Sequence, residues 1–117
     1  MVPNGGSEWP LSKKFGCSYK TAEKLILQAR ELGLNPIGVS FHVGSQQLSL
    51  ETWKKAIAYA SNVFKALSKK EIILSFLNLG GGMPTTYKNK INNCKVYSSN
   101  ILKSINDKFG NLKPVRI

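Results

Sequence analysis

Segments with the apolar spacing of helices alternate along this sequence with short apolar segments that have the spacing of strands. Helices are predicted at residues 18–32, 49–68 and 92–109, and strands at 37–43 and 72–79, with the opening of another strand at 115–117. Chains that alternate in this way build parallel sheets through right-handed crossovers, with helices packed on the sheet. The sequence therefore predicts an α/β fold with parallel strands and no internal domain boundary.

The predicted helices carry local start and stop signals. Ser18 and Ser49 stand where an N-terminal capping residue belongs, and Gly33 stands where a left-handed C-terminal cap belongs. The second helix has an apolar stripe formed by Leu50, Trp53, Ala56, Ile57, Ala60, Phe64 and Leu67. In the third helix we expect the inward-facing residues to be Val96, Ile101 and Ile105, and the stop to be Gly110.

The two predicted strands differ in pattern. The first alternates, so its bulky residues should pack on the helices while its small and polar residues face the other way. The bulky set is Ile37, Val39, Phe41 and Val43, and the small and polar set is Gly38, Ser40 and His42. The second strand, at 72–79, is apolar on both faces, which predicts a parallel strand that is covered on both sides.

In parallel α/β folds, functional residues gather at the C-terminal ends of the strands. The second strand is followed directly by Gly80, Gly81 and Gly82. The N–H groups of such a triplet can converge on an anion because no Cβ stands in the way. Phosphate binding and a plain tight turn both remain open for these glycines on sequence alone.

The end of the first strand carries His42, the only histidine of the chain, and Ser45 three residues later. An imidazole can stack on an aromatic cofactor, and a hydroxyl can bind an anion. A lone histidine at a strand end is equally often a hydrogen-bonded structural residue. No nucleophile–base–acid set and no metal site are predicted, and the glutamates are expected to be exposed or terminal, namely Glu8, Glu23, Glu31, Glu51 and Glu71.

The net charge of +11 comes from 17 Lys and Arg against 6 Asp and Glu. Only Arg30 and Arg116 are arginines, and the lysines are scattered over polar helix faces, which favours a solvated surface over nucleic-acid binding. Cys17 and Cys94 stand far apart, which predicts neither a metal site nor a disulfide and fits the reducing cytoplasm. No apolar run predicts a membrane span or a signal peptide, so a cytoplasmic protein is expected.

Three motifs occur in a specific order over nearly the whole chain: KFG at 14–16, GVSFHVGS at 38–45 and GGGMP at 80–84. Together they resemble the fold-type III pyridoxal-phosphate-dependent decarboxylases, which act on ornithine, lysine, arginine or diaminopimelate. The segments WPLSKKFG, FHVGSQQ and LNLGGG look most like those of bacterial ornithine/lysine decarboxylases. The resemblance covers roughly residues 9–117.

This resemblance implies part of a (β/α)8 barrel of the alanine-racemase type. A complete barrel needs roughly 250 residues, and this chain has 117, so residues 1–117 are expected to form a single partial domain. The resemblance also implies pyridoxal 5′-phosphate as the cofactor. His42, the catalytic residue implied by the family pattern, would stack on the cofactor ring, and the phosphate would be held by Ser45, Gly80, Gly81 and Gly82.

The activity implied by the resemblance is that of a carboxy-lyase for ornithine or lysine in polyamine biosynthesis, with a homodimeric parent enzyme. A diaminopimelate decarboxylase and a non-catalytic truncated remnant are the alternatives. The chain has Asn78 and Met83 where many relatives have Asp and Phe. Both changes look compatible with the family's pattern.

By the same resemblance, the family's Schiff-base lysine lies upstream of Met1, and its EPGR glutamate and C-terminal domain follow Ile117. We therefore expect this chain alone to release no carbon dioxide from ornithine or lysine. Borohydride reduction in the presence of the cofactor checks this expectation, because a single labelled lysine together with turnover would contradict it.

Overall fold

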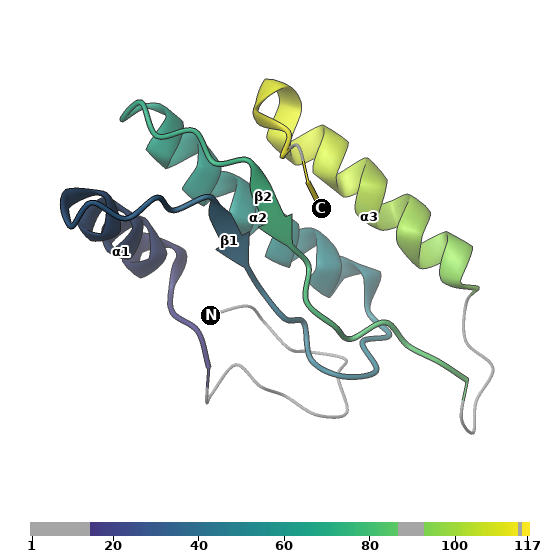
Figure 1. The fold of residues 1–117 in the computed structure, drawn as a ribbon. Coiled ribbons are helices and arrows are strands. Elements are labelled where there is room, and N and C mark those ends of the chain that lie inside the picture. Colours follow the sequence, from purple (N-terminus) through teal and green to yellow (C-terminus); the bar gives the residue numbers. More distant parts are fainter. Residues whose placement is uncertain (1–14, 87–92, 115) are drawn as a thin grey trace.

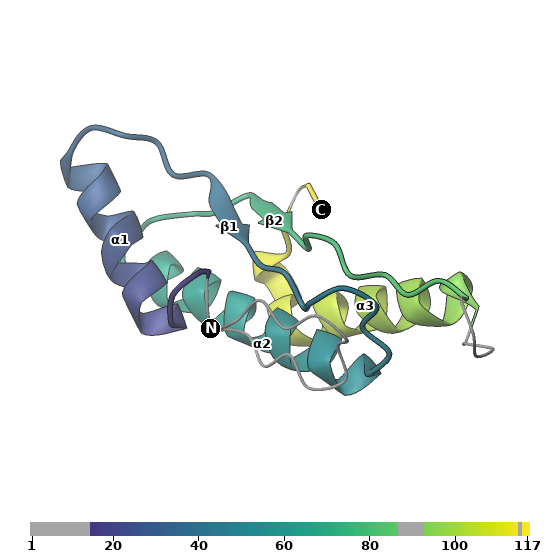
Figure 2. The same ribbon diagram turned by 90° about the horizontal axis from the view of Figure 1, so that it is seen from below.

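The computed structural model describes residues 15–86, 93–114 and 116–117. In these residues three helices pack against one face of a small parallel sheet (Figures 1 and 2). The elements in chain order are α1 (Tyr19–Glu31), β1 (Gly38–Ser40), α2 (Leu50–Ser68), β2 (Phe76–Asn78), α3 (Cys94–Phe109) and the short 3-10 helix η1 (Gly110–Leu112). The order of helices and strands is the one that the sequence predicts.

The helix boundaries follow the local capping signals. The Ser18 hydroxyl accepts a hydrogen bond from the Thr21 N–H at 3.1 Å, and the Ser49 hydroxyl accepts one from the Thr52 N–H at 3.3 Å. Each bond satisfies one of the backbone donors that the first turn of a helix leaves unpaired. After α1, Gly33 adopts a φ of +79°, which ends the helix. These predictions are confirmed.

The strands β1 and β2 are parallel neighbours, and Val39 lies opposite Leu77 in their register. Arg116 forms a parallel bridge with Phe76, so β2 lies between β1 and the backbone around Arg116. The parallel pairing is therefore confirmed, and Arg116 stands where the opening of a further strand was predicted. Val115, the first residue of that predicted strand, lies outside the described residues.

Both strands are shorter than the segments predicted at 37–43 and 72–79. One hydrogen bond continues the ladder beyond the strands at their C-terminal ends, from the Phe41 N–H to the Asn78 carbonyl at 3.0 Å. Beyond that bond the backbone turns at Gly44, with a φ of +91°, and at Gly80, with a φ of +67°. Extended pairing stops at these positive φ values, because a strand requires negative φ.

The core lies between the sheet and the helices. From the sheet side, Val43 and Leu77 are fully buried. Phe64 of α2 meets Phe109 of α3 edge to face, with ring centroids 5.0 Å apart. The predicted stripe of α2 is confirmed, because Trp53, Ala56, Ile57, Ala60, Phe64 and Leu67 are buried and Leu50 packs against them.

Three predicted core positions are wrong. Val96 is 40% exposed, and its neighbour Tyr97 is buried and donates its hydroxyl hydrogen to the Leu48 carbonyl at 3.2 Å. Ile37 is 55% exposed, although its carbonyl accepts hydrogen bonds from the N–H groups of Ser75 and Phe76 at 2.9 and 3.0 Å. Ile73 is 69% exposed, because within the described residues all helices lie on one face of the sheet (Figure 2). None of the described helices is long and apolar enough to cross a membrane.

Candidate functional site

Two loops leave the sheet at the C-terminal ends of its strands, and they run side by side (Figure 1). The first, residues 41–48, follows β1 and is here named the histidine loop. The second, residues 79–86, follows β2 and is named the glycine loop. Because the strands are parallel neighbours, residues that are about 40 positions apart in sequence meet at this edge.

The imidazole of His42 is half-buried and has a defined hydrogen-bond partner. Its Nδ1 accepts a hydrogen bond from the Gly44 N–H at 2.9 Å. A nitrogen that accepts carries no proton, so the neutral ring bears its hydrogen on Nε2. His42 is thus held by its own loop through one nitrogen while the other nitrogen can donate.

The glycine loop lies in close contact with His42. A Cβ built on Gly81 would stand 3.0 Å from His42 Nε2, and a Cβ built on Gly80 would overlap the Phe41 carbonyl. Gly82 has a φ of +107°, and its Cβ would overlap the Gly44 carbonyl. Side chains larger than hydrogen do not fit between these loops without moving one of them. The structure therefore brings His42 and the three glycines together.

The N–H groups of the three glycines are not equivalent. The Gly80 N–H donates to Asn78 Oδ1 at 2.8 Å, so it is already engaged. Within the residues that the structure describes, the N–H groups of Gly81 and Gly82 make no hydrogen bond to protein. Two neighbouring backbone donors therefore have no protein partner in this part of the structure, and Gly81 lies beside the His42 ring. Consecutive backbone N–H groups without partners are a feature of anion-binding loops.

Ser45 lies on the histidine loop directly after the buried Gly44, and its side chain is exposed. It shares the loop with His42 and so stands at the same edge of the sheet as the glycine loop. Neither loop contains an aspartate or a glutamate, so no carboxylate on these two segments opposes an incoming anion.

The acidic residues lie elsewhere in the described part of the chain. Glu23 of α1 pairs with Lys70 at 2.9 Å, and Glu51 of α2 pairs with Lys54 at 3.8 Å. The expectation that Glu23 is exposed is wrong, because its side chain is only 24% exposed beside Lys70. Glu31, Glu51 and Glu71 are exposed as predicted, and Glu8 lies outside the described residues.

Two glutamines that the sequence analysis did not single out join the two loops. The Gln47 N–H donates to the Gly82 carbonyl at 2.9 Å. The Gln46 side chain bonds the Thr85 backbone at two points. Two consecutive glutamines shortly before the helix cap Ser49 were the available signal, but their partners lie almost 40 residues away in sequence.

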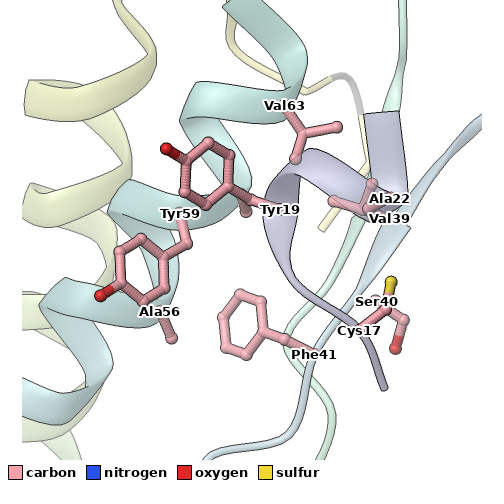
Figure 3. A pocket seen from close by; sticks show the side chains of 10 residues that line it. Cys17, Tyr19, Ala22, Val39, Ser40, Phe41, Ala56, Tyr59 and Val63 are labelled. Carbon is pink, nitrogen blue, oxygen red and sulfur yellow. The ribbon is translucent and has the colours of Figure 1, made fainter. Parts of the chain in front are cut away.

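An apolar hollow lies between α1, α2 and β1, and Phe41, the first residue of the histidine loop, is the one residue of the two loops in its wall (Figure 3). Its wall includes the rings of Tyr19 and Tyr59, which stack with centroids 6.0 Å apart, and the side chain of Phe41. The tyrosine hydroxyls point away from the other labelled side chains, and Cys17 lies at the far side (Figure 3). We therefore place the candidate site at the loops and not in this hollow.

The chain matches the family model described as "Pyridoxal-dependent decarboxylase, pyridoxal binding domain" over residues 4–117. It is 40% identical to ornithine decarboxylase of Mus musculus over 81 residues, which are 69% of this chain and 18% of that protein. It is 32% identical to lysine/ornithine decarboxylase of Selenomonas ruminantium over 113 residues, which are 97% of this chain and 28% of that protein. The chain thus spans less than a third of the length of these curated relatives.

Solved structures of similar fold include a mutant of SrLDC in complex with PLP. That structure superimposes with a TM-score of 0.88 at 29% sequence identity, over 99% of this chain and 30% of its own chain. Diaminopimelate decarboxylase of Helicobacter pylori, solved with L-lysine, superimposes with a TM-score of 0.76 at 32% identity, over 89% of this chain and 26% of its own. The small parallel sheet with helices on one face is consistent with part of the barrel of such enzymes.

Proposed function

We propose, from the premise that this chain belongs to the pyridoxal-dependent decarboxylases and matches their pyridoxal-binding domain, that its two loops hold the phosphate end of pyridoxal 5′-phosphate. Residues 1–117 would then form one partial domain of the barrel that carries the cofactor. The reaction that we propose for the whole protein is the decarboxylation of a basic amino acid, with ornithine or lysine as the substrate.

One observation carries this proposal. The N–H groups of Gly81 and Gly82 make no hydrogen bond within the described residues. The backbone of Gly81 lies against His42 Nε2, and the backbone of Gly82 lies against the Gly44 carbonyl, each too close for a Cβ. A phosphate binds backbone N–H groups that it can approach closely, and two consecutive glycines supply such donors with no Cβ to cover them. The residues present therefore fit the cofactor's phosphate group.

Each residue then has a distinct part. Gly81 and Gly82 donate their N–H groups to phosphate oxygens, and the hydroxyl of Ser45 donates a further hydrogen bond. Gly80 shapes the turn, because its own N–H is engaged by Asn78 at 2.8 Å. The imidazole of His42 packs on the cofactor ring and keeps its proton on Nε2. The cofactor supplies the electron withdrawal that lets carbon dioxide leave the substrate.

The choice of substrate rests on the relatives. The name of the Mus musculus relative gives ornithine as its substrate. The name of the Selenomonas ruminantium relative gives lysine and ornithine. A diaminopimelate decarboxylase is also a structural neighbour at 32% identity, which keeps this third amino acid as the alternative substrate. We further propose that the whole protein works as a homodimer, as the resemblance implies.

The proposal predicts that the full-length protein carrying this chain binds pyridoxal 5′-phosphate at least about a hundredfold more tightly than pyridoxal. Two or three hydrogen bonds to a charged phosphate, at roughly 1.5–3 kcal/mol each, account for such a ratio. Ser45→Ala should weaken cofactor binding roughly tenfold and leave pyridoxal binding unchanged. Titration of both ligands, followed by absorbance, measures these constants.

Ser99→Ala is the matched control, because Ser99 is an exposed serine of α3 away from both loops. Carbon dioxide release from ornithine, lysine and diaminopimelate, assayed in parallel, then ranks the substrates. Equal affinities for the phosphorylated and the unphosphorylated ligand would overturn the phosphate site, whichever substrate is preferred.

A further inference from the structure

We propose that Gln46 is a positioning residue that holds the glycine loop in the geometry needed for phosphate binding. The inference rests on the proposed function, and it assigns a role to a side chain that need not touch the cofactor. It starts from the contacts that Gln46 makes across the two loops, which no motif of the sequence indicates.

The Gln46 amide meets the Thr85 backbone at two points. Its Nε2 donates to the Thr85 carbonyl at 2.9 Å, and its Oε1 accepts from the Thr85 N–H at 2.8 Å. One side chain thus satisfies both backbone groups of a residue on the neighbouring loop, as a partner strand would do in a sheet. The two bonds fix both the distance and the orientation of the glycine loop at Thr85.

The backbone of Gln46 adopts an unfavourable conformation to make this contact. Its φ is +52°, in the left-handed region that residues with a Cβ rarely occupy. Such a conformation persists only where its surroundings hold it in place. Here the next residue supplies part of that support, because the Gln47 N–H donates to the Gly82 carbonyl at 2.9 Å.

Gln47 also anchors the histidine loop to the protein body. Its side chain is fully buried, its Nε2 donates to the Val43 carbonyl at 2.9 Å, and its Oε1 accepts from the Ser49 N–H at 3.0 Å. Ser49 is the cap of α2, so the loop that carries Gln46 is tied to the start of a long helix. Gln46 therefore projects from a fixed base.

The consequence concerns the N–H groups of Gly81 and Gly82, which have no hydrogen-bond partner among the described residues. Gly82 is held at its carbonyl by Gln47, and three residues later Thr85 is held by Gln46. Between these bonds and the turn at Gly80, the backbone of Gly81 and Gly82 is held against the histidine loop. Without Gln46 the downstream half of the glycine loop loses its attachment, and phosphate binding must then order it.

Two variants of the full-length protein separate this role from general stability. Gln46→Met keeps the size of the side chain and removes both hydrogen bonds. Gln46→Gly also removes both bonds, but it relieves the backbone at φ +52°. We expect both variants to bind pyridoxal 5′-phosphate about tenfold more weakly, because two hydrogen bonds that hold the loop are lost and phosphate binding must then order it. Pyridoxal has no phosphate, so its affinity should be unchanged. Gln28→Met, on the exposed face of α1, is the matched control.

Amide hydrogen exchange of the ligand-free protein gives a readout that is independent of the cofactor. The Thr85 N–H should exchange faster in both variants than in the wild type, because its acceptor on Gln46 is gone. If Gln46 had only a structural role, cofactor affinity would follow the thermal stability of each variant. Gln46→Gly relieves the strained backbone, so it would then bind the cofactor as the wild type does.

The outcomes separate the two proposals. Unchanged cofactor affinity in both variants, with the wild-type preference for the phosphorylated ligand intact, would overturn the role of Gln46 alone. If the wild type shows no preference for the phosphorylated ligand, the phosphate site fails and the role of Gln46 fails with it. Weaker cofactor binding in both variants together with faster exchange at Thr85 supports the role.

Discussion

Replacing Gly82 with alanine is expected to weaken the binding of pyridoxal 5′-phosphate to the full-length protein by about a hundredfold or more. Gly82 has a φ of +107°, where a residue with a Cβ is strained by roughly 1–3 kcal/mol. The added Cβ would also overlap the Gly44 carbonyl and lie 2.9 Å from Val43 Cγ2. Forcing the two loops apart costs about another 1–3 kcal/mol.

Both costs fall on the part of the glycine loop that we propose binds the phosphate. The variant should therefore lose its preference for the phosphorylated ligand over pyridoxal, which a paired titration of the two ligands measures. The control is Gly33→Ala, because Gly33 has a similar positive φ of +79° but open space where a Cβ would stand. Gly33→Ala should lower stability by roughly 1–2 kcal/mol and leave cofactor affinity unchanged. Wild-type affinity in Gly82→Ala would show that the contact between the loops does not matter for binding.

The second large effect is expected at Leu77, the buried residue of β2. Leu77 is fully buried, and it lies opposite Val39 in the parallel pair. Leu77→Ala removes most of a core side chain and leaves a cavity, which costs about 2–5 kcal/mol in free energy of unfolding. Because domains are stable by only about 5–15 kcal/mol, this loss is a large fraction of the total.

Ile73→Ala is the matched control for Leu77→Ala, because it shortens an aliphatic side chain of the same segment that is 69% exposed. Its effect should stay within about 0.5 kcal/mol. The midpoint of urea unfolding of the full-length protein, compared between the two variants, measures the difference. Equal losses at both positions would mean that, in the whole protein, Ile73 is covered as completely as Leu77.

The helices were predictable because their signals are local. Ser18 and Ser49 cap helices through bonds to residues three positions later, at 3.1 Å and 3.3 Å. The stripe of α2 is buried as predicted, since a helix shows the same face to its neighbours over five turns. Local signals failed at α3, where Val96 was predicted to be buried but Tyr97 is buried in its place. Contacts with other parts of the chain, such as the Leu48 carbonyl, decide which of these two neighbours faces inward.

The strands were predictable in place and direction but not in length or covering. The apolar runs located β1 and β2, and the alternation with helices indicated that they are parallel. Their ends depend on how the two backbones meet near Phe41 and Asn78. The exposure of Ile73 depends on whether helices cover each face of the sheet. The apolar pattern within one strand segment does not show which faces are covered.

For the candidate site, the sequence by itself determined which residue types stand at the two strand ends, because His42 lies near the end of one predicted strand and the three glycines directly follow the other. Only the tertiary structure decided how they meet. It engages the Gly80 N–H with Asn78 and places Gly81 against His42 and Gly82 against Gly44. It also brings Gln46 to Thr85, 39 residues away. The physical reason is that hydrogen bonds between the two loops depend on how the parallel strands align, and residues far apart in sequence set that alignment. Helix caps, in contrast, depend on residues that are only a few positions apart.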